Sequence, residues 1–64
     1  MVTREELAAF LQSQGWQLQM VKRNQTLYAY AKKRVGKRVL GRYLKTERQL
    51  DKLTPEYVLK RIAL

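Results

Sequence analysis

The sequence predicts an α+β domain, with an N-terminal helix, a three-stranded antiparallel β-meander and a C-terminal helical segment packed on one sheet face. Three patterns support this prediction. An amphipathic segment with a capping motif comes first, three segments with alternating polarity and short turns follow, and a second helix-start signal comes last. Sixty-four residues suffice for one small domain near the lower limit for independent folding, so residues 1–64 are expected to form one domain.

The first predicted helix spans about residues 4–14. Thr3 stands at the N-cap position, with a glutamate three residues later, which is the capping-box pattern. Leu7 and Leu11 have the spacing of a buried helical face, joined by Phe10 or an alanine. Gly15 is the expected residue that ends the helix, because glycine adopts the left-handed backbone of a helix C-terminus.

Three strands are predicted after this helix. Apolar and polar residues alternate over 16–20 and again over 27–32, and residues 39–44 form the third strand. The polar segment 22–25 and the glycine-containing segment 35–37 are short enough to be turns. Consecutive strands with short connections pair with their neighbours, so the second strand is expected at the centre of the sheet.

The pairing of the first two strands follows from a turn at Asn24 and Gln25. This turn groups the apolar side chains on one face, which must hold the core because a slip of one residue would bury glutamines and a lysine. The apolar face carries Trp16, Leu18, Met20, Leu27, Ala29 and Ala31. The opposite, solvent-facing side carries Gln17, Gln19, Tyr28, Tyr30, Lys32 and Arg34.

The third strand has two alternative registers. A two-residue turn at Val35 and Gly36 would point Val39 and Tyr43 outward and place Arg42 on the core face. A three-residue loop ending in Gly36 would point Arg38 and Arg42 outward and bury Val39 and Tyr43. We favour the second register, because an inward arginine is costly unless it reaches solvent at an edge. This choice leaves Leu40 and Leu44 exposed.

The C-terminal part contains one ambiguous segment and one clear helix signal. Residues 46–53 either form a short helix or connect irregularly, with Leu50 and Leu53 spaced to reach the core. Thr54 and Pro55 supply a hydroxyl N-cap and a proline at the first helical position. The second helix is therefore predicted from Pro55 to Ala63, with Val58, Leu59 and Ile62 buried.

Charge is concentrated in the middle of the chain. Ten of the fourteen lysines and arginines lie between Lys22 and Arg48, where Glu47 is the only acidic residue, so this segment carries the whole net charge of +9. Such a cluster of cations favours a polyanionic partner, with nucleic acid first. Lysines and arginines bind phosphates, amides and guanidinium groups bond base edges, and tyrosines stack on bases or donate to phosphates. The candidate nucleic-acid-binding residues are Gln17, Gln19, Lys22, Arg23, Tyr28, Tyr30, Lys32, Arg34, Lys37, Arg38 and Arg42.

The composition argues against an enzyme. The chain has no histidine, the commonest general base, and no cysteine, and its paired Glu5 and Glu6 are explained as residues that cap the first helix. No catalytic residue, cofactor or metal site is predicted.

No membrane-spanning segment is predicted either, because the longest apolar runs have five residues and a membrane span needs about 20. The N-terminal residues do not match a secretory signal, and a cytoplasmic location is the expectation.

The run from Trp16 to Leu53 resembles the arm-type DNA-binding domains of tyrosine integrases. The matching stretches are Trp-Gln-Leu-Gln-Met at 16–20, Gly-Lys-Arg at 36–38 and Lys-Thr-Glu-Arg-Gln-Leu at 45–50. The resemblance implies three antiparallel strands followed by a helix, with the sheet reading the major groove of DNA. This chain departs from the family by adding a helix in front and by interrupting the C-terminal helix at Thr54 and Pro55.

The leading hypothesis is therefore a small non-enzymatic protein that binds duplex DNA through the basic outer face of its sheet, with transcription regulation as the corresponding role. RNA or ribosome binding is the first alternative, with Tyr28 and Tyr30 stacked on unpaired bases. The second alternative is an adaptor or inhibitor that docks on an acidic protein surface. The exposed Leu40 and Leu44 of the favoured register would support that docking or a homodimer. A membrane partner is not expected, because the basic segment reads as strands.

Overall fold

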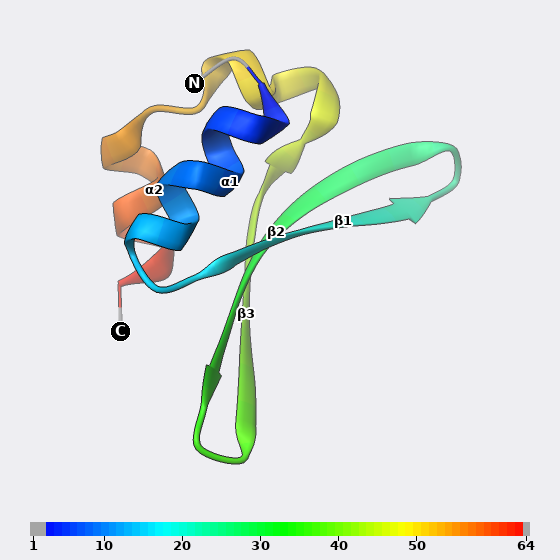
Figure 1. Cartoon of the computed structure of the whole chain (residues 1–64). Helices are drawn as coiled ribbons and strands as arrows, with labels where there is room; N and C mark the ends of the chain where they lie inside the picture. Colours follow the sequence, from blue (N-terminus) through cyan, green and yellow to red (C-terminus); the bar gives the residue numbers. More distant parts are fainter. Residues whose placement is uncertain (1–2, 64) are drawn as a thin grey trace.

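The computed structural model describes residues 3–63 and confirms the predicted α+β fold (Figure 1). Its elements are α1 (Arg4–Ser13), β1 (Gln17–Arg23), β2 (Thr26–Val35), β3 (Arg38–Thr46), the 3-10 helix η1 (Glu47–Lys52) and α2 (Pro55–Ile62). The strands form one antiparallel sheet in the order β1-β2-β3, with β2 at the centre. Both helices pack on the same side of this sheet, where their apolar residues meet those of β2 and β3.

Helix α1 begins and ends where the sequence predicts. The hydroxyl oxygen of Thr3 accepts a hydrogen bond from the backbone N–H of Glu6 at 3.1 Å, which satisfies an N–H group that has no partner within the helix. At the other end Gly15 has a φ of 81°. Beyond it, the N–H of Trp16 donates to the carbonyl of Leu11 at 2.8 Å, as in a Schellman motif. This motif turns the chain so that Trp16 is carried into the core together with Leu11.

The register of β1 and β2 is the predicted one. Gln17 pairs with Lys32 and Met20 pairs with Ala29 across the two strands. The connecting residues Asn24 and Gln25 have φ values of 48° and 66°. Positive φ at both central residues is the signature of a type I′ turn, whose twist matches that of the flanking strands.

The predicted register of β3 is wrong. The turn consists of two residues, Gly36 and Lys37, so that Val35 pairs with Arg38 instead of closing a three-residue loop. Gly36 has a φ of 60° at the first turn position, as a type II′ turn requires. Val39 and Tyr43 therefore lie on the face opposite the helices. Leu40 and Leu44, which the favoured register predicted to be exposed, point toward the core instead, where Leu44 is fully buried.

This register reverses the orientation of Arg42, which pairs with Ala31 on the helix side of the sheet. The objection to an inward arginine does not apply, because β3 is an edge strand. Arg42 is only half-buried, and its Nη1 atom donates to the carbonyl of Gly41 at 3.1 Å. A long side chain at an edge can cover apolar surface with its methylene groups while its charged end stays near solvent.

A β-bulge interrupts β3 after Tyr43. Tyr43 pairs with Tyr30, but the next paired residue, Tyr28, meets Thr46, so β3 has one extra residue in this interval. Leu44 enters the core within the bulge. The next residue, Lys45, extends over the ring of Tyr57 in α2, with Nζ 4.7 Å from the ring centroid. The bulge thus lets two consecutive residues of β3 contact the helical layer.

The core lies between the sheet and the helices. Small side chains at the centre of β2, Ala29 and Ala31, are completely buried and allow the larger residues of α1 and α2 to approach the sheet. The buried set comprises Leu7, Leu11, Trp16, Ala29, Ala31, Leu44, Leu50, Leu53, Val58 and Ile62. Within the described residues, this core contains no buried polar or charged side chain.

The structure decides between the short helix and the irregular connection that the sequence left open at residues 46–53. Glu47–Lys52 forms a 3-10 helix, and Leu50 and Leu53 are buried as predicted. In α2 the hydroxyl of Thr54 accepts from the N–H of Tyr57 at 3.2 Å, which confirms the predicted cap. Leu59, however, is 43% exposed, so its predicted burial is wrong.

Two hydrogen bonds explain the rotation of α2 that exposes Leu59. The hydroxyl of Tyr57 donates to the carbonyl of Leu44 at 3.1 Å, and Nε of Arg61 donates to the carbonyl of Tyr43 at 2.9 Å. Residues four apart lie on one face of a helix, so these bonds direct the Tyr57 face toward β3. The helix therefore also satisfies carbonyl groups on the otherwise open edge of the sheet.

Replacing Trp16 with alanine should destabilise the domain by about 3–5 kcal/mol, because Trp16 is 97% buried and its loss leaves a large cavity. Chemical denaturation checks this, with Leu59→Ala as the matched control. Leu59 is half exposed, so its truncation should cost clearly less. Equal unfolding midpoints for Trp16→Ala and the parent protein would show that the core is assigned to the wrong residues.

Replacing Gln25 with glycine should stabilise the domain by about 0.5–1 kcal/mol. Gln25 holds a left-handed φ of 66° that costs a side-chain-bearing residue energy, and Asn-Gly is the preferred type I′ pair. Gln17→Gly, in the extended backbone of β1, should have the opposite sign because glycine weakens a strand. Thermal unfolding of both variants tests the turn, and a lower midpoint for Gln25→Gly would contradict it.

Candidate nucleic-acid interface

The face of the sheet opposite the helices is called the open face here. It is defined by the strand registers, because directly paired residues point to the same side of a sheet. β1 contributes Gln17, Gln19, Val21 and Arg23; β2 contributes Thr26, Tyr28, Tyr30, Lys32 and Arg34; and β3 contributes Val39, Gly41, Tyr43 and Thr46. The open face therefore has no acidic residue.

Three tyrosines form the centre of the open face. Tyr30 lies directly opposite Tyr43, with ring centroids 5.5 Å apart and an edge-to-face angle of 61°. Tyr28 contacts the same ring at 6.1 Å with a tilt of 54°. This geometry is that of a stabilising cross-strand aromatic pair with a third ring added. The tyrosines thus support the sheet, as well as offering ring surface to a partner.

The tyrosine hydroxyls and the glutamine amides of the open face are available for a partner, whereas the hydroxyl of Thr46 donates to Oε1 of Gln49 at 3.3 Å. In the described part of the chain, the hydroxyl groups of Tyr28, Tyr30 and Tyr43 form no hydrogen bond. Gln17 and Gln19 are exposed beside them, and each glutamine offers both a donor and an acceptor. These tyrosines and glutamines can therefore form hydrogen bonds without first breaking internal ones.

Five of the predicted cations lie on the open face or at a turn. Lys32 pairs with Gln17, and Arg34 pairs with Val39 nearer the β2–β3 turn. Arg23 lies at the end of β1, opposite Thr26. Lys22 precedes it on the helix side of the sheet but is exposed next to the turn, and Lys37 is itself a turn residue.

Arg38 and Arg42, by contrast, were assigned to the wrong face. Both alternate with the open-face residues of β3, so they point to the helix side. Arg42 lies beside the core, whereas Arg38 is exposed near the β2–β3 turn. The sequence reasoning missed Tyr43 and Val39 in their place. The two-residue turn at Gly36 and Lys37 is the signal that would have identified them, because it determines which β3 residues face outward.

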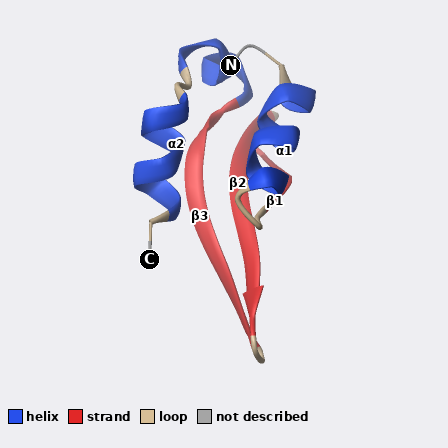
Figure 2. Cartoon of the chain, turned by 60° about the vertical axis from the view of Figure 1, so that its left-hand side comes forward, coloured by secondary structure: helices blue, strands red, loops and turns tan. Residues whose placement is uncertain are grey.

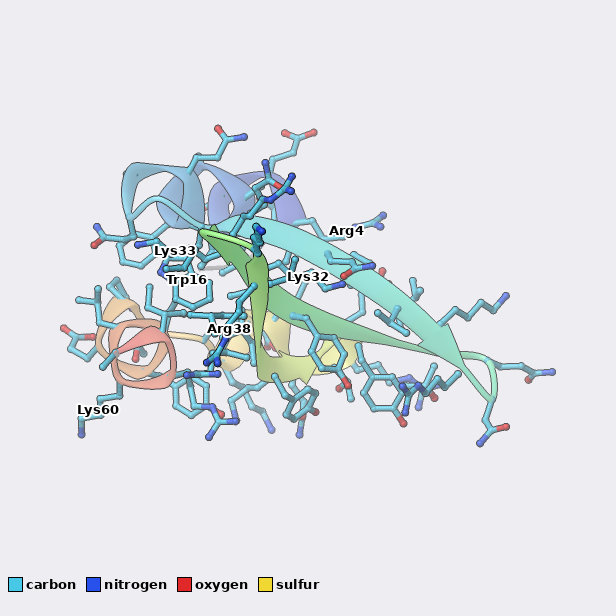
Figure 3. All side chains as sticks on the ribbon, turned by 90° about the horizontal axis from the view of Figure 1, so that it is seen from below. Arg4, Trp16, Lys32, Lys33, Arg38 and Lys60 are labelled. Carbon is cyan, nitrogen blue, oxygen red and sulfur yellow. The ribbon has the colours of Figure 1, made fainter. Side chains whose placement is uncertain are left out.

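Neighbouring lysines in β2 have different surroundings. Lys33 lies beside Trp16 on the helix side, with Nζ 5.8 Å from the ring centroid (Figure 3). A cation at this distance is attracted by the ring, and the lysine side chain also covers part of it. Lys32 points to the other side of the strand, onto the open face. The basic segment is therefore divided between the two faces, and only a part of its charge belongs to the candidate interface.

Comparison with protein-family models, with curated proteins and with solved structures finds no match to this chain. The resemblance to arm-type integrase domains thus stays a prediction. Within the described residues, no helix is long and apolar enough to cross a membrane.

The tyrosine cluster predicts an energetic coupling between Tyr30 and Tyr43. A double-mutant cycle with alanine at both positions should give a coupling of about 0.5–1.5 kcal/mol in unfolding free energy, because the two rings contact each other edge to face with centroids 5.5 Å apart. The cycle between Gln17 and Tyr43, which lie on β1 and β3 with β2 between them, should be additive. No coupling between the tyrosines would contradict the register of β3.

Proposed function

We propose that this protein binds nucleic acid, in particular duplex DNA, through the open face of its sheet. The observation that carries the proposal is the combination on one uncovered face of cations, amides and phenols without any acidic residue. Cations attract the phosphate backbone, and amides and guanidinium groups form hydrogen bonds to base edges. The helices stabilise the sheet from the other side and leave this face free.

The shape of the open face favours a duplex with an accessible groove. Three strands about 4.8 Å apart form a narrow surface, and the major groove of B-DNA, about 12 Å wide, admits β-structure. The major groove of duplex RNA is too narrow for side chains to read. Duplex DNA is therefore the double-stranded partner that fits best.

The tyrosine cluster supports a second candidate, which is binding of RNA or DNA through unpaired bases. Aromatic rings on an uncovered sheet face are a common platform on which such bases stack. Tyr30 and Tyr43 already contact each other edge to face, however, so part of their surface is occupied. We therefore rank stacking below duplex binding.

The alternative of docking on an acidic protein loses its supporting feature. It depended on exposed Leu40 and Leu44, but both side chains contribute to the core. The same change removes the argument for a homodimer through these leucines. Nucleic acid thus remains the partner class that the open face favours.

Binding to duplex DNA should weaken steeply with salt. Five cations on the open face or at its turns would neutralise about five phosphates, giving a log–log slope near −4.5 at about −0.9 per phosphate. Fluorescence anisotropy with duplex DNA, single-stranded DNA, duplex RNA and polyglutamate, at several salt concentrations, measures this. A slope shallower than about −2, or no binding to duplex DNA at low salt, would overturn the proposal. Tighter binding to single strands would favour stacking instead.

Lys32→Gln and Lys33→Gln form a matched pair, because these neighbours differ by which face they occupy. Lys32→Gln should make the salt slope shallower by about 0.9, the contribution of one phosphate contact. Lys33→Gln removes the same charge from the helix side and should leave the slope unchanged. Anisotropy titrations compare the two. Equal losses would show that binding depends on net charge and not on the open face.

A further inference from the structure

Both hairpin turns of the sheet project beyond the helical layer. Residues 34–39 form a run of six exposed residues around the β2–β3 turn, and residues 22–25 form an exposed run around the β1–β2 turn. We call these two runs the hairpin tips. Figure 1 shows the β1–β2 tip extending away from the helices, and Figure 2 shows the β2–β3 tip extending past both of them. Both tips are therefore accessible from several sides.

The tips are basic and free of acidic residues within their own sequences. The β1–β2 tip contains Lys22 and Arg23, and the β2–β3 tip contains Arg34, Lys37 and Arg38. Arg38 points to the helix side of the sheet but is still accessible to a partner, because no helix covers the β2–β3 tip (Figure 2). Glu47 and Arg48 line a shallow hollow beside the β1–β2 turn, where their opposite charges offset each other. Each tip thus presents a local excess of positive charge.

The separation of the tips follows from the length of β2, since one tip lies at each end of this strand. Ten residues at about 3.3 Å each give β2 a length of about 30 Å along the strand, and the curvature of the strand makes the straight distance between the tips shorter (Figure 1). One helical turn of B-DNA is about 34 Å, or about 10 base pairs. Side chains of arginine and lysine reach a few ångströms beyond the backbone at both ends. With this reach added to the length of β2, the tips can contact phosphates that lie up to about one helical turn apart.

Resting on the proposed function, we propose that the two hairpin tips bracket one binding footprint on duplex DNA. Each tip contacts backbone phosphates at one end of a segment of about 10 base pairs, and the open face covers the segment between them. The sheet twists so that the tips point in different directions (Figure 1). A DNA backbone also changes direction as it winds, so a twisted sheet can present cations to phosphates at both ends. Arg38 regains a role in binding through its tip, although it is absent from the open face.

The first experiment measures affinity against duplex length. Blunt DNA duplexes from about 6 to 16 base pairs are titrated with the full-length protein at low salt. Affinity should rise steeply up to about 10 base pairs, where the second tip finds phosphates. Beyond that length it should rise only in proportion to the number of available registers. Full affinity on the duplex of about 6 base pairs would overturn the proposed footprint. A rise in affinity that stays steep up to the duplex of about 16 base pairs would overturn it as well.

The second experiment removes one tip at a time. Lys22→Gln with Arg23→Gln removes both cations of the β1–β2 tip, and Lys37→Gln with Arg38→Gln removes two of the three cations of the β2–β3 tip, leaving Arg34. Each double variant should make the salt slope on a duplex of about 12 base pairs shallower by about 1.8, so that about tenfold less affinity is lost between about 50 and 200 mM salt. All four residues are exposed, so folding should survive.

The matched control removes two charges from the helical side. Lys52→Gln with Lys60→Gln changes the net charge equally, but Lys52 lies in η1 and Lys60 points away from the sheet on α2 (Figure 3). Its salt slope should equal that of the parent protein. An effect of only one tip would overturn the bracketing while leaving binding by the open face in place. An equal loss in the control would show that binding depends on net charge, which contradicts both the bracketing and the open face as the binding surface. Failure of the parent protein to bind duplexes of any length would instead contradict the proposed function itself.

Discussion

The structure depends on the burial of one face of β2. Ala29 and Ala31 lie at its centre with no exposed surface, and their small size allows residues of both helices to pack closely against the sheet. Because alternate residues of a strand point to opposite faces, burying these alanines places Tyr28 and Tyr30 on the other side. The core and the candidate interface are therefore two consequences of one alternation.

Besides covering the core, the helical layer forms hydrogen bonds to the edge strand of the sheet. Tyr57 and Arg61 bond to carbonyl groups of β3, which reduces the unpaired polar groups that an edge strand exposes. The β-bulge in β3 brings Leu44 and Lys45 to α2 and leaves Tyr43 on the open face. Within a chain of 64 residues, which has little core to stabilise it, the same residues thus secure the fold and shape the surface.

The charge distribution differs from what the linear sequence suggests. The basic segment reads as one block, but the sheet separates it into the open face, the hairpin tips and the helix side. Lys33 and Lys45 lie over aromatic rings and support the fold. The proposals above therefore depend on position, and they treat adjacent lysines such as Lys32 and Lys33 differently.

The sequence by itself determined α1, α2, the β1–β2 turn and the pairing of β1 with β2, because these follow from local signals: caps at Thr3 and Thr54, the glycine at 15, and strict alternation. It placed Gln17, Gln19, Tyr28, Tyr30 and Lys32 on the open face, as the structure does. Only the tertiary structure decided the register of β3. Both registers bury apolar residues of similar size, so the choice rested on the turn at Gly36 and on the edge position of Arg42. The rotation of α2 was likewise decided by its bonds to β3, since helical periodicity alone cannot distinguish Tyr57 from Leu59 as the residue that faces the sheet.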